Sequence, residues 1–346
     1  MSETVIPLKT YDVLNLIKII AAFFVVTIHV HFPGDFGLAV IDIARFAVPF
    51  FFMVSGFFGY CPDKNRSVEK IKKRIKNIIF MFLSISVVYI VYKIVVAVLF
   101  YSNSPADVLE ELFSAEAIVN FIFFNEPSVS VFLWYLPALI YTYVVFLVFE
   151  KNRLTQKMYF LIPFLFIAGV AFREIIEIPS DLPAFFRNSF LFRNYLFVGV
   201  PFFLFGHYIK SNEDKIKKEF SYLSLIFIML AGFAESVIAG NMHLQKNVYL
   251  GTFTAVFAIF VLAIKAEDRL NVKKISVAGS KYSMYIYLLH ILVKNIIIIC
   301  VQYGGLNKLY NELKFIMPVI VFVITFIVSV VFVFIKDKIK NLIKVR

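Results

Sequence analysis

The sequence has few charged side chains and almost no cysteine. Charged residues make up 17% of its 346 residues, and the two cysteines, Cys61 and Cys300, stand far apart in the chain. Two isolated cysteines fit neither a disulfide framework nor a metal motif. None of the five histidines belongs to an HxxxH or HxxE pair, so we expect no metal site. The low charge also argues against a soluble protein, whose surface would be rich in charge.

Hydrophobic residues are abundant instead. They form 61% of the chain, which contains 43 Phe and 18 Tyr and has a mean hydropathy of +0.84. Because one membrane crossing takes about 20 mostly apolar residues, this composition predicts an all-α membrane bundle of about ten transmembrane helices. No repeat or linker divides the chain, so we expect a single domain over residues 1–346. The predicted spans are 13–32, 38–60, 77–101, 130–149, 158–172, 191–209, 220–240, 247–264, 280–302 and 315–335.

The positive charges are unevenly distributed along the chain. With a cytoplasmic N-terminus, 24 of the 35 Lys and Arg residues fall in cytoplasmic segments and only five in the opposite loops. This bias follows the positive-inside rule, so we expect both termini in the cytoplasm and the helices in a lipid bilayer. Topology therefore explains the net charge of +12, and we expect no nucleic-acid partner. No small-residue cleavage site follows the first span, which we expect to remain as a permanent helix.

Lys18 and His29 stand out within the first predicted span. A separation of eleven residues returns them to nearly the same helix face, about 16 Å apart along the axis. Ionisable residues inside membrane spans are costly and mostly functional. A cation near one surface and a titratable base toward the other indicate two ends of a path through the bundle.

Two histidines lie close together at the end of this span. His29 and His31 are two residues apart, so on a continuous helix they point to nearly opposite faces and only one can line a given cavity. We choose His29 because it shares its face with Lys18. Its ordinary pKa suits general-base catalysis near neutral pH, and the alternative is a structural hydrogen bond.

Other polar residues interrupt the later spans. Arg45 follows Asp42 by three residues, which predicts either an internal ion pair or a ligand-binding pair. Ser55 lies at the inner end of the second span, where a small residue allows close approach of a helix or ligand. Arg193 opens the sixth span, and Glu235 lies on the seventh, where a carboxylate needs a cationic or hydroxyl partner.

The ninth span carries a continuous polar stripe. Its members follow the spacing i, i+4, i+7 and i+11 on an otherwise apolar helix: Ser283, Tyr287, His290 and Lys294. Such a stripe must face the bundle interior or a water-filled cavity. At the cytoplasmic side, residues 64–76 predict a short basic helix. It either contacts anionic lipid headgroups or binds an anionic ligand, in which case Lys73 and Arg74 would hold phosphates.

These residues together resemble a known family. The chain is similar along nearly its whole length to the acyltransferase-3 family of bacterial membrane O-acyltransferases. The similarity rests on the K-x10-H pair of Lys18 and His29 and on five segments, in order: VPFFFMVSGFF (48–58), KKRIKNI (72–78), FLWYLPAL (132–139), FRNYLFVGVPFFLFGHYI (192–209) and GSKYSMYIYLLH (279–290). Lys18 stands at a position where the family more commonly has arginine. A lysine ammonium would hold a phosphate or carbonyl less specifically than an arginine guanidinium would.

The resemblance implies a reaction across the bacterial plasma membrane. An acyl-CoA, by analogy acetyl-CoA, would bind at the basic cytoplasmic face through Lys18, Lys73 and Arg74, with its pantetheine arm passing Ser55. His29 would deprotonate an extracytoplasmic hydroxyl on a glycan, cell-wall component or small molecule. The oxyanion would be stabilised, or the acceptor oriented, by residues of the polar cluster, namely Arg45, Arg193 or Tyr287, with His290 and Glu235 as further members of the site. The sequence is compatible with a homo-oligomer and does not decide the oligomeric state.

The main alternative is transport. The segment RNYLFVGVPFFLFGHYI also resembles the membrane half of vancomycin-resistance serine racemases, which is thought to supply serine. In that case the same polar cluster would bind a zwitterionic amino acid such as serine. Matched glycine or proline interruptions in two halves, which mark transporters with broken helices, are not evident. A structural membrane partner without a ligand is a third interpretation, but it leaves both polar stripes unexplained.

Overall fold

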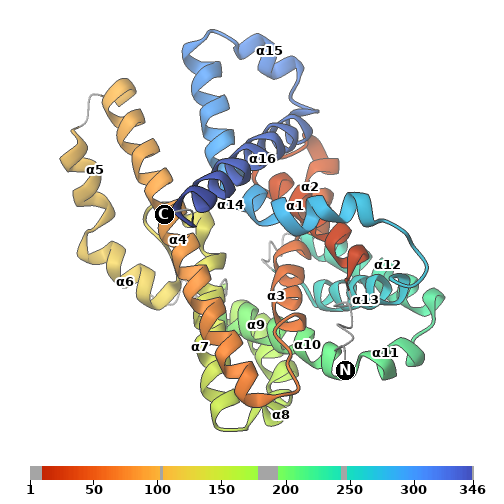
Figure 1. The fold of residues 1–346 in the computed structure, drawn as a ribbon. Coiled ribbons are helices and arrows are strands. Elements are labelled where there is room, and N and C mark those ends of the chain that lie inside the picture. The colour runs from red at the N-terminus through yellow and green to blue at the C-terminus, as the bar shows by residue number, and fades with distance from the viewer. Residues whose placement is uncertain (1–9, 102–103, 178–193, 243–247, 345–346) are drawn as a thin grey trace.

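The computed structural model describes residues 10–101, 104–177, 194–242 and 248–344 (Figure 1). Within these ranges every regular element is a helix, as the sequence predicts. Seven of the helical segments there are long and apolar enough to cross a membrane: Asp12–His29, Gly34–Phe57, Lys64–Tyr101, Val131–Lys151, Tyr222–Asn241, Lys273–Tyr303 and Met317–Ile339. The protein is therefore an all-α membrane helix bundle, and these seven segments cover seven of the predicted spans.

Three predicted spans correspond to shorter elements. They are α9 (Leu161–Glu177), α13 (Leu250–Ala266) and the π-helical turn η3 (Tyr195–Gly199) with α10 (Val200–Ser211) that follows it. Asn194 begins η3 as its N-cap, because its side chain accepts hydrogen bonds from the amides of Leu196 and Phe197 at 2.9 and 3.0 Å. The segment 115–124, too short to span, forms the separate helix α6 (Ala115–Phe124). The remaining short helices are α5 (Pro105–Leu112), η1 (Val131–Leu133), α8 (Thr155–Met158), α11 (Glu213–Glu219) and α15 (Asn307–Glu312).

The first helix ends earlier than the sequence predicts. Helix α1 (Asp12–His29) stops at His29, and Val30 adopts an extended conformation with φ −127° and ψ 98°. Pro33 follows closely and cannot continue a helix, and the residue before a proline is itself disfavoured in helical geometry. His29 therefore occupies the last turn of the helix, and His31 lies in the loop beyond it.

The second span is bent at Arg45 and Phe46, between α2 (Gly34–Ala44) and α3 (Ala47–Phe57). Pro49 has no amide hydrogen and so cannot bond to the carbonyl of Arg45 four residues earlier. The amides of Arg45 and Phe46 bond to carbonyls three residues back, at 3.4 and 3.3 Å, which is the tighter 3₁₀ pattern. The bend places Arg45 at a corner rather than inside a straight helix.

Glycines allow the central helices to cross at very short range. A β-carbon on Gly206 of α10 would lie 1.9 Å from the carbonyl oxygen of Met53, and one on Gly56 of α3 would lie 1.8 Å from that of Phe203. Helix α14 (Lys273–Tyr303) meets α1 in the same way, since a β-carbon on Gly279 would lie 1.6 Å from a carbonyl oxygen of α1. Small residues at such crossings let helix backbones pack closely in a membrane.

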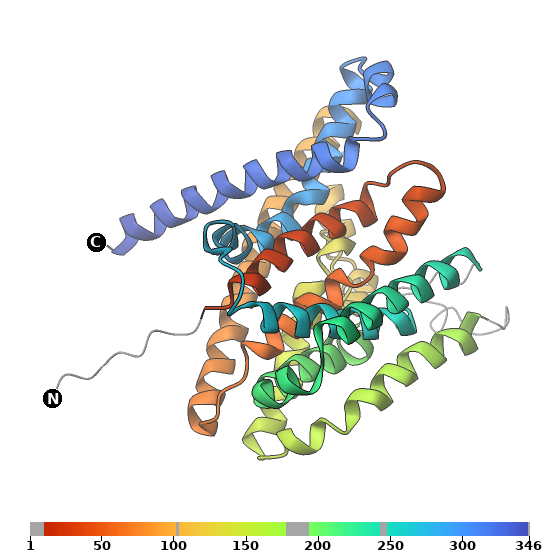
Figure 2. The ribbon, with the colours of Figure 1, turned by 90° about the vertical axis from the view of Figure 1, so that its right-hand side faces the viewer.

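The remaining long helices surround this centre (Figure 1). They are α4 (Lys64–Tyr101), α7 (Tyr135–Lys151), α12 (Tyr222–Asn241) and α16 (Met317–Lys344). The start of α1 and the end of α16 lie on the same side of the bundle (Figure 2). The topology predicted from the positive-inside rule places the basic segments at the start of α4 and in α11 on this same, cytoplasmic side.

A polar cluster fastens the start of α1 to α11. The hydroxyl of Tyr11 donates a 2.7 Å hydrogen bond to Glu213, which also pairs with Lys210 and, at 3.2 Å, with Lys217. Burial alone would raise the pKa of Glu213, but the hydrogen bonds from Lys210 and Tyr11 outweigh it and lower the pKa to about 2. The carboxylate is therefore ionised at neutral pH and holds the two elements together.

Candidate active site

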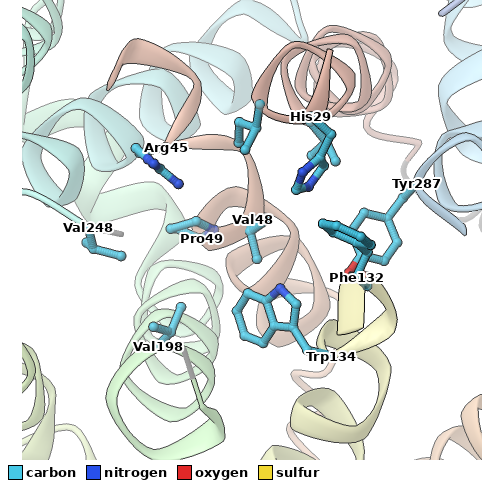
Figure 3. A pocket seen from close by; sticks show the side chains of 11 residues that line it. His29, Arg45, Val48, Pro49, Phe132, Trp134, Val198, Val248 and Tyr287 are labelled. Carbon is cyan, nitrogen blue, oxygen red and sulfur yellow. Dashed lines mark hydrogen bonds between the residues drawn. The ribbon is translucent and has the colours of Figure 1, made fainter. Parts of the chain in front are cut away.

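One pocket inside the bundle brings together residues from six separate parts of the chain (Figure 3). We call it the His29 pocket. Its volume is about 50 Å³, which leaves room for a few water molecules. It is lined by Val25, Ile28, His29, Arg45, Val48, Pro49, Phe132, Trp134, Val198, Val248 and Tyr287. Three of the sequence-predicted site residues, His29, Arg45 and Tyr287, therefore meet in one place.

The His29 imidazole is held between two rings. It stacks on His290 with ring centroids 5.2 Å apart and an interplanar angle of 28°, and it meets Phe132 edge-on at 4.7 Å. His29 is the last residue of α1, and its side chain points from this helix into the pocket (Figure 3).

His290 lies behind His29 and is almost fully buried, with 1% of its surface exposed. Its Nδ1 lies 2.6 Å from the carbonyl oxygen of Tyr287. A carbonyl only accepts hydrogen bonds, so Nδ1 carries the proton and Nε2 of the neutral ring presents its lone pair. Within the described residues that Nε2 has no hydrogen-bond partner. His290 can therefore accept a proton or a hydrogen bond at the back of the site.

Tyr287 forms part of the pocket wall with its hydroxyl already engaged. The hydroxyl donates a 2.7 Å hydrogen bond to the carbonyl oxygen of Phe132, which joins α14 to the segment before α7. Three members of the predicted stripe face cavities or the site, since Tyr287 lines the His29 pocket, His290 stacks on His29 and Lys294 lines a second cavity. The fourth, Ser283, bonds back to the carbonyl oxygen of Gly279 at 2.6 Å.

Arg45 enters the His29 pocket from the bend between α2 and α3. Figure 3 places Arg45 and His29 on different sides of the pocket, with Val48 and Pro49 between them. Asp42, three residues earlier, accepts a 2.7 Å hydrogen bond from the hydroxyl of Tyr249. The bend at Pro49 thus places a cation in the wall of the pocket that the proposed base also lines.

A second cavity adjoins His29. We call it the lysine cavity; its volume is about 240 Å³, and it is lined by His29, Val30, His31, Lys294, Ile297, Ile298, Tyr310, Lys314, Met317 and Val321. The expectation that His29 and His31 cannot line the same cavity is wrong. That expectation assumed a helix through residue 32, whereas α1 ends at His29 and leaves His31 free of helical geometry.

Ser55 and Arg74 meet at the other end of α3. The Arg74 guanidinium donates to the carbonyl oxygen of Ser55 at 3.2 Å, to the hydroxyl of Tyr143 at 2.8 Å and to the carbonyl oxygen of Phe58. A helix leaves its last carbonyls without helical partners, and a cation there also suits the helix dipole. Arg74 thus caps α3, while the neighbouring Lys73 is exposed.

Buried tyrosines connect the two ends of the site. The Ser55 hydroxyl lies 3.4 Å from that of Tyr135, and the Tyr135 ring packs edge-on against Tyr287 at 5.4 Å. Tyr135 and Tyr143 are both about 2% exposed. In this conformation the space between Ser55 and the His29 pocket is filled by aromatic rings.

Lys18 and Glu235 are not among the residues that line the His29 pocket. Lys18 lies about three helical turns from His29 along α1, and its ammonium donates to the side chain of Asn15 at 3.1 Å. Glu235 accepts a 2.7 Å hydrogen bond from the amide of Gly251, so it caps the start of α13. Arg193 lies outside the described residues.

The structure adds site residues that the sequence reasoning did not select. Phe132 and Trp134 line the His29 pocket, and Tyr310 and Lys314 line the lysine cavity. The FLWYLPAL segment contains the first two, so that motif carried a usable signal. Lys314 gave none, because a lysine in a loop is ordinary. Among the described residues, no group of three or more His, Cys, Asp or Glu side chains is placed to hold a metal ion.

Comparison with known proteins identifies a family with which this chain shares its sequence pattern. Residues 11–337 match the acyltransferase-3 family, described as an acyltransferase domain. An amino-acid racemase from Enterococcus faecalis is 25% identical over 289 residues, which cover 78% of this chain and 38% of the relative. A serine/alanine racemase from Enterococcus gallinarum is 25% identical over 303 residues, 79% of this chain and 39% of the relative.

The chain therefore spans about two-fifths of the length of these relatives. No solved structure matches. The family match extends over nearly all of the chain and includes α1, the bend at Arg45 and the stripe on α14. This multi-pass membrane protein belongs to the acyltransferase-3 family.

Proposed function

We propose that this protein is a membrane O-acyltransferase that moves an acetyl group from cytoplasmic acetyl-CoA to a hydroxyl on the opposite side of the bacterial plasma membrane. The observation that carries the proposal is the meeting of His29 and Arg45 in one pocket of the bundle. An imidazole and a guanidinium are the base and the anion stabiliser that acyl transfer to a hydroxyl needs. The acceptor is a glycan, a cell-wall component or a small molecule.

The chemistry follows from these two groups. His29 takes the proton of the acceptor hydroxyl as its oxygen attacks the thioester carbonyl. The carbonyl oxygen gains negative charge, which the Arg45 guanidinium stabilises. The C–S bond then breaks, the new C–O bond remains in the ester, and CoA leaves as a thiolate that receives the proton. His290, packed against His29 with its Nε2 unprotonated, supports the charge that His29 carries in between.

The size of the His29 pocket favours a short acyl group. Its volume of about 50 Å³ suits an acetyl group far better than a long acyl chain. The donor would enter at the basic end, where Lys73 is exposed and can hold phosphate. To bring the thioester past Ser55, the rings of Tyr135 and Tyr143 must move, so we propose that donor binding opens this passage.

The experiment measures donor binding and turnover separately. Calorimetry on detergent-solubilised protein, with CoA as the control ligand, should detect acetyl-CoA binding in wild type and in His29→Gln alike. Membranes containing wild type should release CoA from acetyl-CoA, and membranes containing His29→Gln should release about 100-fold less, as expected when a general base is lost. Normal CoA release by well-folded His29→Gln would remove His29 from the mechanism.

A second candidate is amino-acid transport. The two relatives are named as an amino-acid racemase and a serine/alanine racemase, and they align with this chain over about two-fifths of their length, so an amino acid is a candidate ligand of the shared part. In that case the same pocket would hold a serine carboxylate against Arg45. Uptake of labelled serine into proteoliposomes, without acetyl-CoA binding, would select transport over acylation.

A further inference from the structure

The lysine cavity has walls from three parts of the chain at one end of the bundle. Lys294 comes from α14, His31 from the loop after α1, and Tyr310 and Lys314 from α15 and the segment that follows it. With a volume of about 240 Å³ it is several times larger than the His29 pocket. Its polar side chains are lysines, histidines and a tyrosine, all of which can donate hydrogen bonds.

The charge in the lysine cavity is not balanced. No Asp or Glu is among the residues that line it. Lys294 is half-buried and Lys314 is exposed, and neither side-chain ammonium has a hydrogen bond or ion pair with another described residue. A lysine held inside a membrane bundle normally pairs with a carboxylate or a carbonyl. Two cations facing one cavity without a counter-charge therefore suit an anion supplied from outside.

The position of this cavity connects it to the chemistry. Among the described residues, His29 is the one side chain that lines both the His29 pocket and the lysine cavity. A molecule bound at Lys294 and Lys314 can therefore present another of its groups to His29. The donor side lies in the other direction, toward Arg45, Trp134 and the tyrosines near Ser55.

We propose that the lysine cavity is the acceptor subsite and that it recognises an anionic group, a phosphate or carboxylate, on the molecule whose hydroxyl His29 activates. This inference rests on the proposed function for the acceptor role, but anion binding itself does not require acyl transfer. Lys294 and Lys314 hold the anion by charge-assisted hydrogen bonds, and the Tyr310 hydroxyl adds a neutral donor.

The simpler explanation is that both lysines extend to lipid headgroups or water. This fits Lys314 alone, which is exposed, but it does not explain why Lys294, eleven residues from the start of the predicted stripe, lines the same cavity as Lys314 and His31. Lys308 shows the contrast. It is exposed on α15 and does not line the cavity.

The test uses three small probes with similar hydroxyls: glycerol, glycerate and glycerol 3-phosphate. Saturation-transfer NMR on the purified protein, without acetyl-CoA, should detect glycerol 3-phosphate or glycerate well above glycerol, and added salt should weaken the signal. Lys294→Gln and Lys314→Gln should each weaken anion binding about fivefold or more, whereas the matched control Lys308→Gln should not. Thermal unfolding of each variant confirms that it is folded.

The membrane environment identifies the source of the anion. If phosphatidylglycerol nanodiscs abolish the signal that phosphatidylcholine nanodiscs preserve, an anionic lipid headgroup is the natural occupant. If both kinds of nanodisc preserve the signal, the natural occupant is a water-soluble anionic acceptor. Equal signals for all three probes, or anion binding unaffected in both lysine variants, would overturn the proposal. Because no donor is present, that failure is distinct from a failure of His29→Gln to lose CoA release.

Discussion

Replacing Arg74 by alanine should lower the free energy of unfolding of the protein. Its main effect should be on stability and not on the affinity for the acyl donor. The Arg74 guanidinium caps α3 through the carbonyl oxygens of Ser55 and Phe58 and also bonds to the hydroxyl of Tyr143. Without it, Ser55 keeps a 3.2 Å hydrogen bond from Tyr143, but Phe58 loses its donor. Hydrogen bonds from a charged donor contribute roughly 1.5–3 kcal/mol each.

Because Arg74 is half-buried and one acceptor stays satisfied, we expect a loss of about 3 kcal/mol in the free energy of unfolding. Arg74→Lys should recover only part of it, since an ammonium cannot reach three acceptors as a planar fork does. The assay is denaturant- or heat-induced unfolding in detergent. Lys73→Ala is the matched control, because Lys73 is exposed, and its stability should change by no more than about 0.5 kcal/mol.

The affinity of the Arg74 and Lys73 variants for acetyl-CoA separates a role in stability from a role in donor binding. Lys73→Ala should weaken donor binding while leaving stability intact, because Lys73, unlike Arg74, is exposed and can contact a ligand. An Arg74→Ala variant that unfolded like wild type but lost donor binding would contradict a capping role for Arg74. In that case Arg74 would serve the donor phosphates and another contact would hold the end of α3.

Three further predictions test the packing and the site. Gly206→Ala should cost about 1–3 kcal/mol or more in thermal unfolding, because its β-carbon would lie 1.9 Å from the carbonyl oxygen of Met53. Glu213→Gln should lower stability at pH 7 but not near pH 2. The lowered pKa stabilises the fold above about pH 4.5, and this stabilisation, roughly 1–3 kcal/mol once solvent screening is included, is lost as the pH falls toward 2. Tyr287→Phe should cost about 1 kcal/mol yet keep turnover within a few-fold, because its hydroxyl donates to Phe132 rather than into the pocket.

Each of these has its own control or contrary result. Gly169→Ala places the same group 3.0 Å from Cβ of Phe197, a looser contact than the one at Gly206, so it should cost less, and equal losses at both glycines would contradict the packing argument. An unfolding profile of Glu213→Gln parallel to wild type from pH 7 to pH 3 would exclude the ionised cluster. A Tyr287→Phe variant that is stable but inactive would place that hydroxyl in the chemistry.

Periodicity and composition were sufficient to predict the long helices and the shared face of the polar stripe on α14. The spacing of Tyr287, His290 and Lys294 placed three side chains on one face of α14, and the structure puts all three at the two cavities or against His29. These features depend on residues close together in sequence. The roles of the site residues in catalysis stay predictions.

Contacts between distant segments could not be predicted from the sequence. The bend at Arg45 depends on Pro49, whose effect on an apolar run was not anticipated. The capping role of Arg74 requires α3 and α7 to lie beside α4. Glu235 meets the amide of Gly251 only because α12 and α13 pack closely at their glycines. In each case the partner lies on another helix, and one sequence does not reveal which helices are neighbours.

In the proposed reaction an acetyl group crosses the membrane through the His29 pocket. Sealed inverted vesicles containing the protein, supplied with [¹⁴C]acetyl-CoA in the external medium, test it most directly. We predict that labelled acetyl esters accumulate in the lumen or on its membrane face with wild type and not with His29→Gln, although both bind acetyl-CoA. Equal labelling by the two proteins, or release of CoA with no label reaching the lumenal side, would contradict the account.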